Sequence, residues 1–479
     1  MSDLRQGENI SKGNASISQK RLIHRGILGL LFTVYMFEFT VTLSIFSKDF
    51  LKDLSVSISP YFISLNQIIA GLGLILFGVI RHFLKARTQR KMQIIIANTL
   101  YALTLLYTFI FKNSPAYFIV ILFCDLFMGM LGGVVFYVLS QALSGSRALG
   151  KIVAVGGFTH VMLQFLFQET IGIKWLLIIL LIISSSLVTY MSIYKPWDFI
   201  TDDTMPDEPE DVKLNRSKMG KITLITLAMT AIGIISIASL FVKNISTGSE
   251  NYNWYGWPRL LTGAGFLVVG MISDFRMRRY LPIAALISSI FCIMIPMMTF
   301  SEGYEDLCLS IMYFNKGATL TYMIIASWDI APKLKYPYIY ASLGYFIYLT
   351  IGEILDITLT NIMLKPVTYA LISMLLCIAI IIIMAVQGDL SFNEPYFKSI
   401  NKRNTNYLDF TERFSLTPKE KEVLYKLLTT ELGLQEIADE MYISKRVLQR
   451  YITSIYQKTG AKSRIGLFCL YYDIYGESK

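Results

Sequence analysis

Charged side chains are scarce in this 479-residue sequence. Asp, Glu, Lys and Arg together make up 16% of the residues, whereas 54% of the residues are hydrophobic. A soluble chain typically carries about a quarter charged residues, because charge covers its surface. The scarcity therefore argues against a soluble globular protein. The apolar residues also occur in blocks of about twenty, the length at which an α-helix crosses a hydrocarbon core of about 30 Å.

Cysteine and histidine are also sparse, and their spacing excludes several kinds of chemistry. The five cysteines show no spacing typical of a zinc site or a disulfide framework, so we expect small apolar packing residues. The three histidines are scattered, at His24, His82 and His160. The sequence shows no nucleophile–base pattern, glycine-rich phosphate loop or metal-ligand spacing. We therefore expect no enzyme activity, no metal and no cofactor.

The N-terminal region lacks the pattern of a cleaved leader. Residues 1–25 are polar and basic, and no small-residue cleavage site follows the apolar block that begins near Gly26. We expect this block to be a retained first membrane helix, preceded by a cytoplasmic tail over residues 1–25.

Twelve apolar spans follow along the chain, which predicts an all-α polytopic helix bundle. A longer hydrophilic segment, residues 195–220, separates the sixth span from the seventh and divides the bundle into halves at 26–194 and 221–387. The predicted spans are 26–46, 60–80, 92–111, 115–140, 152–170, 173–194, 221–242, 257–274, 280–300, 308–330, 337–361 and 366–387.

The distribution of Lys and Arg predicts the orientation of these spans. With a cytoplasmic N-terminus, the cytoplasmic segments up to the twelfth span hold 22 Lys and Arg, whereas the opposite face holds seven. Positive charge is retained on the cytoplasmic side during insertion, so both termini are expected there, in the cell membrane. Tryptophans are also expected at the two membrane interfaces, Trp175, Trp254 and Trp257 at one and Trp197 and Trp328 at the other.

After the last span the composition changes abruptly. Residues 388–479 hold 14 Lys and Arg and 12 Asp and Glu. Residues 388–414 carry no sustained apolar stripe and are predicted to be a linker of about 30 Å on average. Amphipathic periodicity resumes in residues 415–475, which predicts a small soluble domain close to the bilayer surface.

The start of this domain carries the signals of a helix N-terminus. Thr417 suits the N-cap, Pro418 suits the first helical position, and Glu420 completes a capping box with Thr417. The apolar stripe of this helix consists of Val423, Leu424, Leu427 and Leu428.

Two further helices are predicted, over residues 434–441 and 445–459. Ser444 can cap the longer one, which ends at Gly460. One stripe of the longer helix is apolar, and the opposite stripe displays cationic and amide side chains. Such a helix suits a DNA major groove, where Arg and Lys pair with guanine or phosphate and Gln can read adenine.

These residues resemble the C-terminal DNA-binding domain of the LuxR family, also called the LuxR/NarL type. The resemblance runs from Leu416-Thr-Pro-Lys-Glu through Glu436-Ile-Ala to Lys462-Ser-Arg464. It implies that the third helix reads the major groove of double-stranded DNA. Where the family usually has Thr-Val-Lys, this chain has Val447-Leu448-Gln449, which removes one cationic contact. The DNA-binding residues implied by position are Ser444, Lys445, Arg446, Gln449, Arg450, Thr453 and Lys462.

The fourth helix of this domain, residues 463–475, is rich in apolar side chains. Some of them must pack on the other three helices, and the surplus suggests a dimer contact, as the family resemblance also implies. A homodimer would let two half-site readers bind a palindrome. The alternative for the whole domain is a helical adaptor that binds protein.

The loop between spans eight and nine resembles the loop motif of the major facilitator superfamily. It contains Gly270, then Asp274 four residues later, then Arg278 and Arg279. The acid at the helix end and the basic cluster can form a charge latch between helices on the cytoplasmic side. The alternative is an ordinary basic cytoplasmic loop. The resemblance implies a facilitator-like fold for the bundle.

Ionisable residues inside apolar spans are costly and usually face a cavity or a partner. The candidates for a ligand pocket are Glu38, Asp125, His160, Lys316 and Glu353. The alternative is structural pairing between helices, with Lys316 opposite an acid. Asp356 is also charged, but its place near a span end offers a simpler explanation.

Together these features predict a membrane-anchored, one-component transcriptional regulator. Its bundle would sense an unknown small molecule within the lipid bilayer, and its tail would bind DNA. The first alternative is a transporter of the facilitator type with a DNA-binding regulatory tail. A membrane scaffold with a protein-binding tail is the second.

Overall fold

A computed structural model describes most of the chain, and every regular element in its described residues is a helix, as the sequence predicted. The predicted N-terminal tail, most of segments 195–220 and 388–414, and Lys462 lie outside those residues. The described residues are 25–47, 59–112, 114, 116–146, 148–170, 174–193, 212–247, 256–275, 278–298, 304–362, 364–386, 410–411, 413–429, 434–441, 443–461, 463–464, 466–467 and 470–471.

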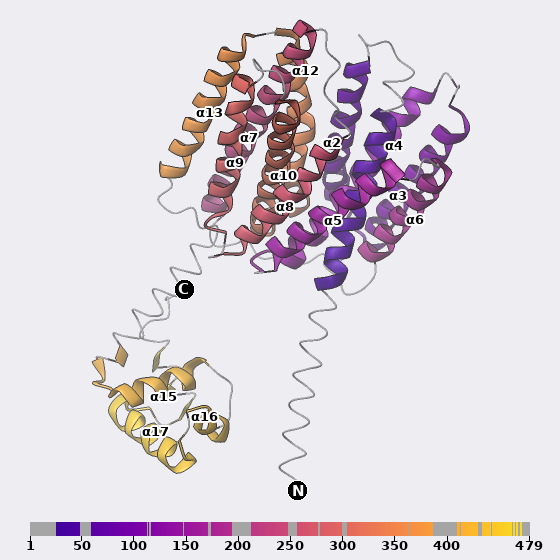
Figure 1. Cartoon of the computed structure of the whole chain (residues 1–479). Helices are drawn as coiled ribbons and strands as arrows, with labels where there is room; N and C mark the ends of the chain where they lie inside the picture. Colours follow the sequence, from indigo (N-terminus) through magenta and orange to yellow (C-terminus); the bar gives the residue numbers. More distant parts are fainter. Residues whose placement is uncertain are drawn as a thin grey trace. The chain divides into compact units, whose positions relative to one another are not determined.

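The chain divides into two compact units, Met1–Phe392 and Asn393–Lys479. The first unit is the helix bundle (Figure 1). Its first half contains Arg25–Ser47, α2 (Ser59–Phe83), α3 (Arg87–Ile110), α4 (Tyr117–Leu143), α5 (Leu149–Thr170) and α6 (Lys174–Ile193). Its second half contains α7 (Val212–Thr247), α8 (Leu260–Ser273), α9 (Leu281–Met298), α10 (Glu305–Ile330), α11 (Pro337–Phe346), α12 (Gly352–Ile362) and α13 (Pro366–Val386).

These helices account for the twelve predicted spans. In the described residues, nine helices are long and apolar enough to cross a membrane, and Trp257–Ser273 and Leu281–Ile295 are shorter apolar helices. The remaining span, α10, is 26 residues long, and Asn315 and Lys316 lower its hydropathy. The protein is therefore a multi-pass membrane protein with an all-helical bundle.

Two helices differ from the predicted spans. Helix α7 begins at Val212, nine residues before the predicted start, because its first turns are polar and do not register as an apolar span. The eleventh span is not continuous α-helix, since a π-helical turn, Ile347–Ile351, joins α11 to α12. Such turns, with i→i+5 hydrogen bonds, are frequent at functional sites.

Glycines allow close approach at equivalent places in the two halves. A Cβ on Gly73 of α2 would overlap the Leu126 carbonyl oxygen of α4. In the second half, a Cβ on Gly265 of α8 would overlap the Phe314 carbonyl oxygen of α10. Small residues at such contacts let helix backbones pack without intervening side chains, which is how helices associate in membranes. The second-with-fourth helix contact thus recurs in each half, as a six-plus-six bundle requires.

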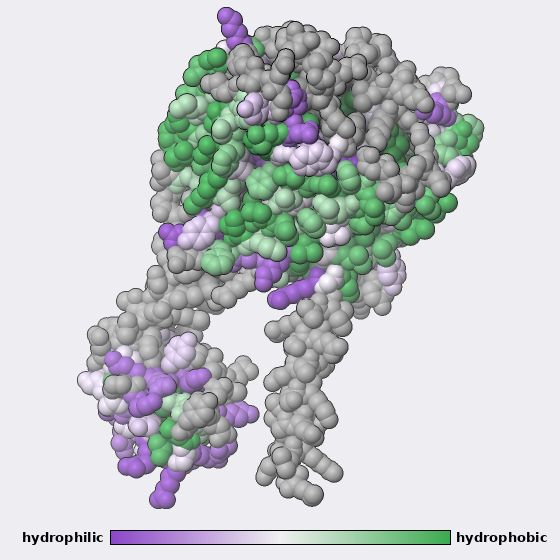
Figure 2. All heavy atoms as spheres, in the orientation of Figure 1, coloured by the Kyte–Doolittle hydropathy of each residue, from purple (hydrophilic) through white to green (hydrophobic). Residues whose placement is uncertain are grey.

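The flank of the bundle is apolar. Hydrophobic side chains cover much of its visible flank in Figure 2, and hydrophilic ones gather along the rim near the start of the first helix. Large apolar side chains such as Leu375, 66% exposed, and Ile110, 62% exposed, point outward. Exposure of this apolar surface to water would be strongly unfavourable in free energy, whereas the hydrocarbon layer of a membrane solvates it.

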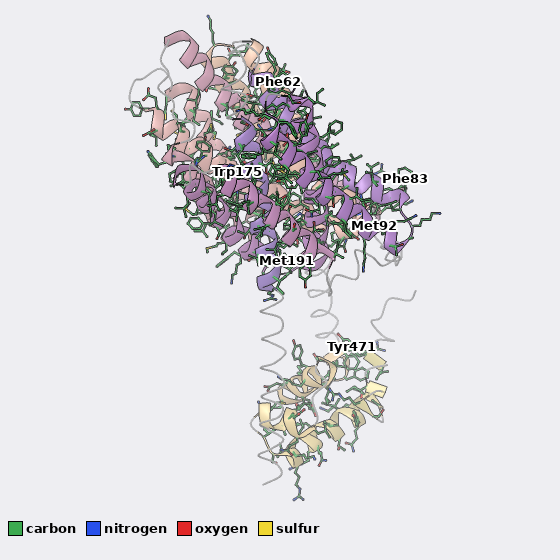
Figure 3. All side chains as sticks on the ribbon, turned by 90° about the vertical axis from the view of Figure 1, so that its right-hand side faces the viewer. Phe62, Phe83, Met92, Trp175, Met191 and Tyr471 are labelled. Atoms are coloured by element: carbon green, nitrogen blue, oxygen red, sulfur yellow. The ribbon has the colours of Figure 1, made fainter. Side chains whose placement is uncertain are left out.

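One of the described tryptophans does not lie at an interface as expected. Trp175, labelled in Figure 3, is exposed on the bundle and packs against Phe109, with ring centroids 4.0 Å apart. Trp257 is also exposed. Trp328 is fully buried between Phe32 and Phe136, so its assignment as an interface anchor is wrong. Trp197 and Trp254 lie outside the described residues.

The second unit is a small helical domain with its own apolar core. Its described helices include α15 (Pro418–Thr429), α16 (Leu434–Glu440) and α17 (Lys445–Thr459). Phe410 and Thr411 are buried in this unit, so it begins inside the segment predicted to be a linker. Phe410 is an isolated aromatic residue and Thr411 is polar, so the two make no apolar stripe and could not be predicted from the sequence pattern.

Candidate nucleic-acid interface and ligand cavity

The first helix of the small domain begins with the capping box that the sequence predicted. The Thr417 backbone N–H donates to Glu420 Oε2 at 2.7 Å, and the Glu420 N–H donates to Thr417 Oγ1 at 3.4 Å. Helix α15 accordingly starts at Pro418. Val423, Leu424 and Leu427 of its apolar stripe are buried in the domain core.

Helix α17 also has the predicted ends. Ser444 caps it, since its side chain accepts a hydrogen bond from the Val447 N–H. Gly460 ends it with a φ of 75°, a left-handed conformation that glycine adopts without steric cost. Leu448, Ile452 and Ile455 are buried, so this face fixes the rotation of α17 on α15 and α16.

The opposite face of α17 carries the predicted DNA-binding side chains. Ser444 and the residues at helical spacing behind it are exposed, and no described part of the domain covers them. Arg and Lys in this position provide donors for phosphate or guanine, and Gln for adenine. The exposed set is Ser444, Lys445, Arg446, Gln449, Arg450 and Thr453. Lys462 lies outside the described residues.

Glu420 ties α15 to the end of α17. Besides its capping role, its carboxylate accepts hydrogen bonds from Ser454 Oγ and Lys458 Nζ, each at 2.6 Å. Burial raises the pKa of Glu420, but the donors from Lys458, Ser454 and Thr417 outweigh it and lower the pKa to about 2. These contacts, across more than thirty residues of sequence, were not predicted.

We expect Glu420→Gln to destabilise the small domain by about 1–3 kcal/mol, because it removes a charge-assisted bond and a salt bridge to Lys458. Urea unfolding of residues 393–479 at pH 7 measures the loss. Because the folded pKa is depressed, the contribution of Glu420 is complete above pH 4.5 and disappears as the pH falls towards 2. Glu422→Gln, at an exposed pair with Lys419, is the control. Equal losses in both variants would contradict the role of Glu420.

Part of the fourth helix packs within the domain. Leu467 and Tyr471 are buried in its core, and Tyr471, labelled in Figure 3, packs against Phe410 with ring centroids 5.2 Å apart. Residues 465, 468–469 and 472–475 of the proposed dimer helix lie outside the described residues. Homodimerisation through this helix therefore stays a prediction.

In the bundle, the loop motif joins the two halves. Asp274, at the end of α8, accepts hydrogen bonds from the backbone N–H groups of Gly150 and Lys151, both at 2.9 Å. These are among the first N–H groups of α5, which have no partner inside their own helix. A carboxylate there also opposes the positive end of the helix dipole. Gly270 packs against Ala154 and Gly150, which brings α8 close to α5.

Arg278 completes this connection. Its guanidinium lies between Asp274 and Asp329 at the end of α10, with Nε donating to Asp329 Oδ2 at 2.9 Å and Nη2 donating to the Ser146 carbonyl. Asp329 in turn accepts from the Gly145 N–H at 2.9 Å. We call Asp274, Arg278 and Asp329 the latch. Arg279 is exposed and makes no part of it.

The first-half loop lacks an acid and uses aromatic rings instead. Arg81 lies over the Tyr137 ring at 4.9 Å, and His82 Nδ1 is 2.8 Å from the Tyr338 hydroxyl. These contacts attach the end of α2 to α4 and α11. In the latch, the role of Asp329 was not predicted from the sequence, because a single acid at the end of a span has no motif around it.

A cavity of about 220 Å³ lies between the halves. We call it the first cavity. His160 and Gln164 of α5 line it from one half, and Arg259 and Lys316 from the other. His160 packs edge-on against Phe266, and Arg259 lies over the Phe165 ring at 5.1 Å. Of the predicted pocket residues, His160 and Lys316 are therefore brought together here.

A second cavity of about 380 Å³ adjoins the first. Glu353 and Asp356 of α12 line it together with Gly233 of α7. Lys316, like Gln67, Tyr313 and Tyr348, lines both cavities. Although Lys316 lies in the middle of α10, its side chain is exposed, because that surface faces the cavities.

Glu38 and Asp125, the other predicted pocket residues, line neither cavity. Both side chains are fully buried in the first half, and within the described part of the chain their carboxylate oxygens have no hydrogen-bond partner. Three residues that were not predicted also line the first cavity: Gln67, Arg259 and Tyr348. Their residue types are common at span ends and interfaces, so the sequence did not single them out. No metal-binding group of three or more His, Cys, Asp or Glu occurs in the described residues.

Comparison with known proteins identifies both units. Residues 414–471 match the family "Bacterial regulatory proteins, luxR family", so the small domain is a LuxR-family helix-turn-helix. The bundle has the fold of the MFS (major facilitator superfamily) proton:xylose symporter XylE bound to 6-bromo-6-deoxy-D-glucose. That likeness has a TM-score of 0.52 at 13% identity, over 74% of this chain and 94% of that one. No curated protein matches the chain.

Proposed function

We propose that this protein is a membrane-bound, one-component transcriptional regulator. The observation that carries the proposal is the presence, in one chain, of a LuxR-type helix with an exposed cationic face and a facilitator-like bundle with a polar internal cavity. The bundle binds a small molecule, and α17 binds double-stranded DNA. The residues proposed to face DNA are Ser444, Lys445, Arg446, Gln449, Arg450, Thr453 and Lys462.

The excess of Lys and Arg on one face of the bundle supports a cytoplasmic position for both termini. The latch is built from loops on that same face, between α4 and α5 and between α8 and α9. In the proposed orientation, Ser47 at the end of the first helix and Arg259 before α8 lie on the exterior side, so the first cavity that they line faces the exterior and the latch lies on the cytoplasmic side. The proposed ligand therefore enters from outside the cell.

Switching requires two arrangements of the bundle that bind the ligand with different affinity. The cavities are lined from both halves, and the latch also joins both halves through its contacts with residues between α4 and α5 and at the start of α5. A ligand that draws the cavity walls together changes the strain on the latch. The halves then rearrange on the cytoplasmic side, which is the side of the DNA-binding domain.

Chromatin precipitation of the intact, tagged protein tests the proposal. We expect enrichment at a small number of sites, and loss of that enrichment when residues 393–479 are removed. A second tagged variant, Leu448→Asp, retains the bundle but disrupts the buried face of α17. Enrichment that survives both changes would contradict DNA binding by the small domain.

The second candidate is a facilitator-type transporter whose tail regulates genes. The observation that favours it is the likeness to a symporter over most of the bundle. Uptake of a cavity ligand into proteoliposomes separates the two functions. Ligand binding without flux favours the sensor, and sustained, saturable uptake favours the transporter.

A further inference from the structure

The two cavities differ in the charged residues that line them. Arg259 and Lys316 line the first cavity, and among the described residues that line it His160 is the one further ionisable residue apart from tyrosines and none is an acid. Glu353 and Asp356 line the second. The cavities share Gln67, Tyr313, Lys316 and Tyr348, so they adjoin one another along these side chains. The basic residues of the first cavity are therefore followed by the acidic residues of the second, and Tyr313 and Tyr348 line both cavities.

We propose that the ligand is a small dipolar molecule with a carboxylate at one end and an ammonium group at the other. The carboxylate binds Lys316 and Arg259, and the ammonium group binds Glu353 and Asp356. Its apolar or aromatic body lies against Tyr313 and Tyr348. This inference rests on the proposed sensing function and names the chemical class that the cavity recognises.

The partners of the central charges support a dipolar ligand. Lys316 and Glu353 attract one another across the second cavity, and the neutral side chains of Tyr348 and Ser64 line the cavity beside them. Within the described part of the bundle, no salt bridge joins Lys316 to Glu353. A charge inside a bundle gains most from an oppositely charged, hydrogen-bonding partner. A dipolar ligand supplies one to each side at once.

The size of the space agrees with this class. Cavities of about 220 and 380 Å³ fall in the range of small-molecule sites, which are mostly apolar with a few polar groups that fix orientation. The second cavity combines such groups with Met229, Ile234 and Ile237. A ligand with charge at both ends and an apolar middle matches that distribution, whereas a sugar has no charge to offer.

Binding measurements on the purified full-length protein in nanodiscs test the proposal. Three dipolar probes differ in the spacing of their charges: L-tyrosine, 6-aminohexanoate and 4-(aminomethyl)benzoate. Each has two singly charged counterparts, which for the last are 4-methylbenzoate and 4-methylbenzylamine. We expect at least one dipolar probe to bind tenfold or more tightly than both of its counterparts in calorimetry. Failure of all three to exceed their counterparts would overturn the proposal.

Charge-neutral substitutions assign the two ends. We expect Lys316→Gln to reduce the affinity for the best probe at least tenfold while leaving its amine counterpart unaffected. Glu353→Gln should reduce it similarly while leaving the acid counterpart unaffected. If either variant weakens the acid and the amine equally, the proposed orientation is wrong.

A steric variant checks the location. A Cβ on Gly233 would meet only Asn315 Nδ2, at 3.7 Å, so Gly233→Leu fills the second cavity without displacing a helix. We expect it to abolish probe binding. Gly220→Leu, on the same helix with open space around it, is the matched control and should bind normally. Unchanged binding in Gly233→Leu would place the ligand elsewhere.

The outcome is separable from that of the proposed function. If the chain binds DNA and responds to a neutral or singly charged molecule instead, the dipolar class is wrong and the regulator stands. If a dipolar probe binds as expected but the protein occupies no DNA site, the ligand class stands and the regulator does not.

Discussion

Replacing Arg450 by alanine is expected to weaken DNA binding about ten- to a hundredfold. Arg450 is exposed in the middle of the α17 face, between the buried Leu448 and Ile452 on the other side of the helix. A bidentate contact from Arg to guanine contributes about 1–3 kcal/mol, and a tenfold change in affinity corresponds to about 1.4 kcal/mol. The measurement is a gel shift or fluorescence anisotropy titration of the full-length protein with a DNA site identified by chromatin precipitation.

Lys419→Ala is the matched control for Arg450→Ala. It also removes an exposed positive charge from the small domain, but it lies on α15, where Lys419 pairs with Glu422. We expect less than a twofold change in DNA affinity. Similar losses of DNA affinity in both variants would mean that Arg450 acts only through the net charge of the domain.

The salt dependence of the same variant shows what Arg450 contacts. If it contacts phosphate, the slope of log affinity against log salt becomes shallower by about one, and the loss is equal for all sequences. If it reads a base, the slope changes little and discrimination at one base pair is relaxed. Both results agree with a DNA-reading α17, and an unchanged affinity does not.

Arg278→Ala is expected to lower the stability of the bundle by about 3–5 kcal/mol. Removing one partner of a buried salt bridge leaves the others uncompensated, and here Asp274 and Asp329 would both lose the guanidinium. The backbone of Arg278 has a φ of 75°, which is unusual for a residue other than glycine. This conformation therefore depends on the contacts of the Arg278 side chain. SDS-induced unfolding of the full-length protein in detergent measures the loss.

The neighbouring Arg279 provides the control, because it has the same charge but is exposed. Arg279→Ala should change stability by less than about 0.5 kcal/mol, as most surface substitutions do. A double-mutant cycle with Asp329→Ala completes the test. If the latch acts as a unit, the double variant loses less than the two single losses combined, and strict additivity would contradict it.

Local signals in the tail were sufficient to predict the beginnings of α15 and α17 and the end of α17. The capping box of Thr417 and Glu420, the Ser444 cap and the stop at Gly460 each depend on a few consecutive residues, and each is present. The bond from Glu420 to Lys458 depends on how α15 packs on α17. No spacing in the sequence records that packing, so the second role of Glu420 became visible only in three dimensions.

In the bundle, the sequence predicted the spans well, but it indicated only some of the residues that line the two cavities. Span length follows from membrane thickness, which any apolar block reveals. A nearly uniformly apolar helix, however, gives no sign of which side faces a cavity. Glu38 and Lys316 are both single charges in apolar spans, yet Lys316 faces the cavities and Glu38 is buried in the first half. Only the rotation of each helix about its axis separates the two.

The π-helical turn at Ile347–Ile351 sets the angular register of everything after it. It accommodates one more residue per turn than an α-helix would, and Tyr348 lies within it while Glu353 and Asp356 follow. If the same residues wound as an uninterrupted α-helix, α12 would be rotated by about 100° relative to the residues before the turn. Both carboxylates would then swing out of the second cavity with no change in their chemistry. The acidic side of the cavity therefore depends on a backbone insertion as much as on the acids themselves.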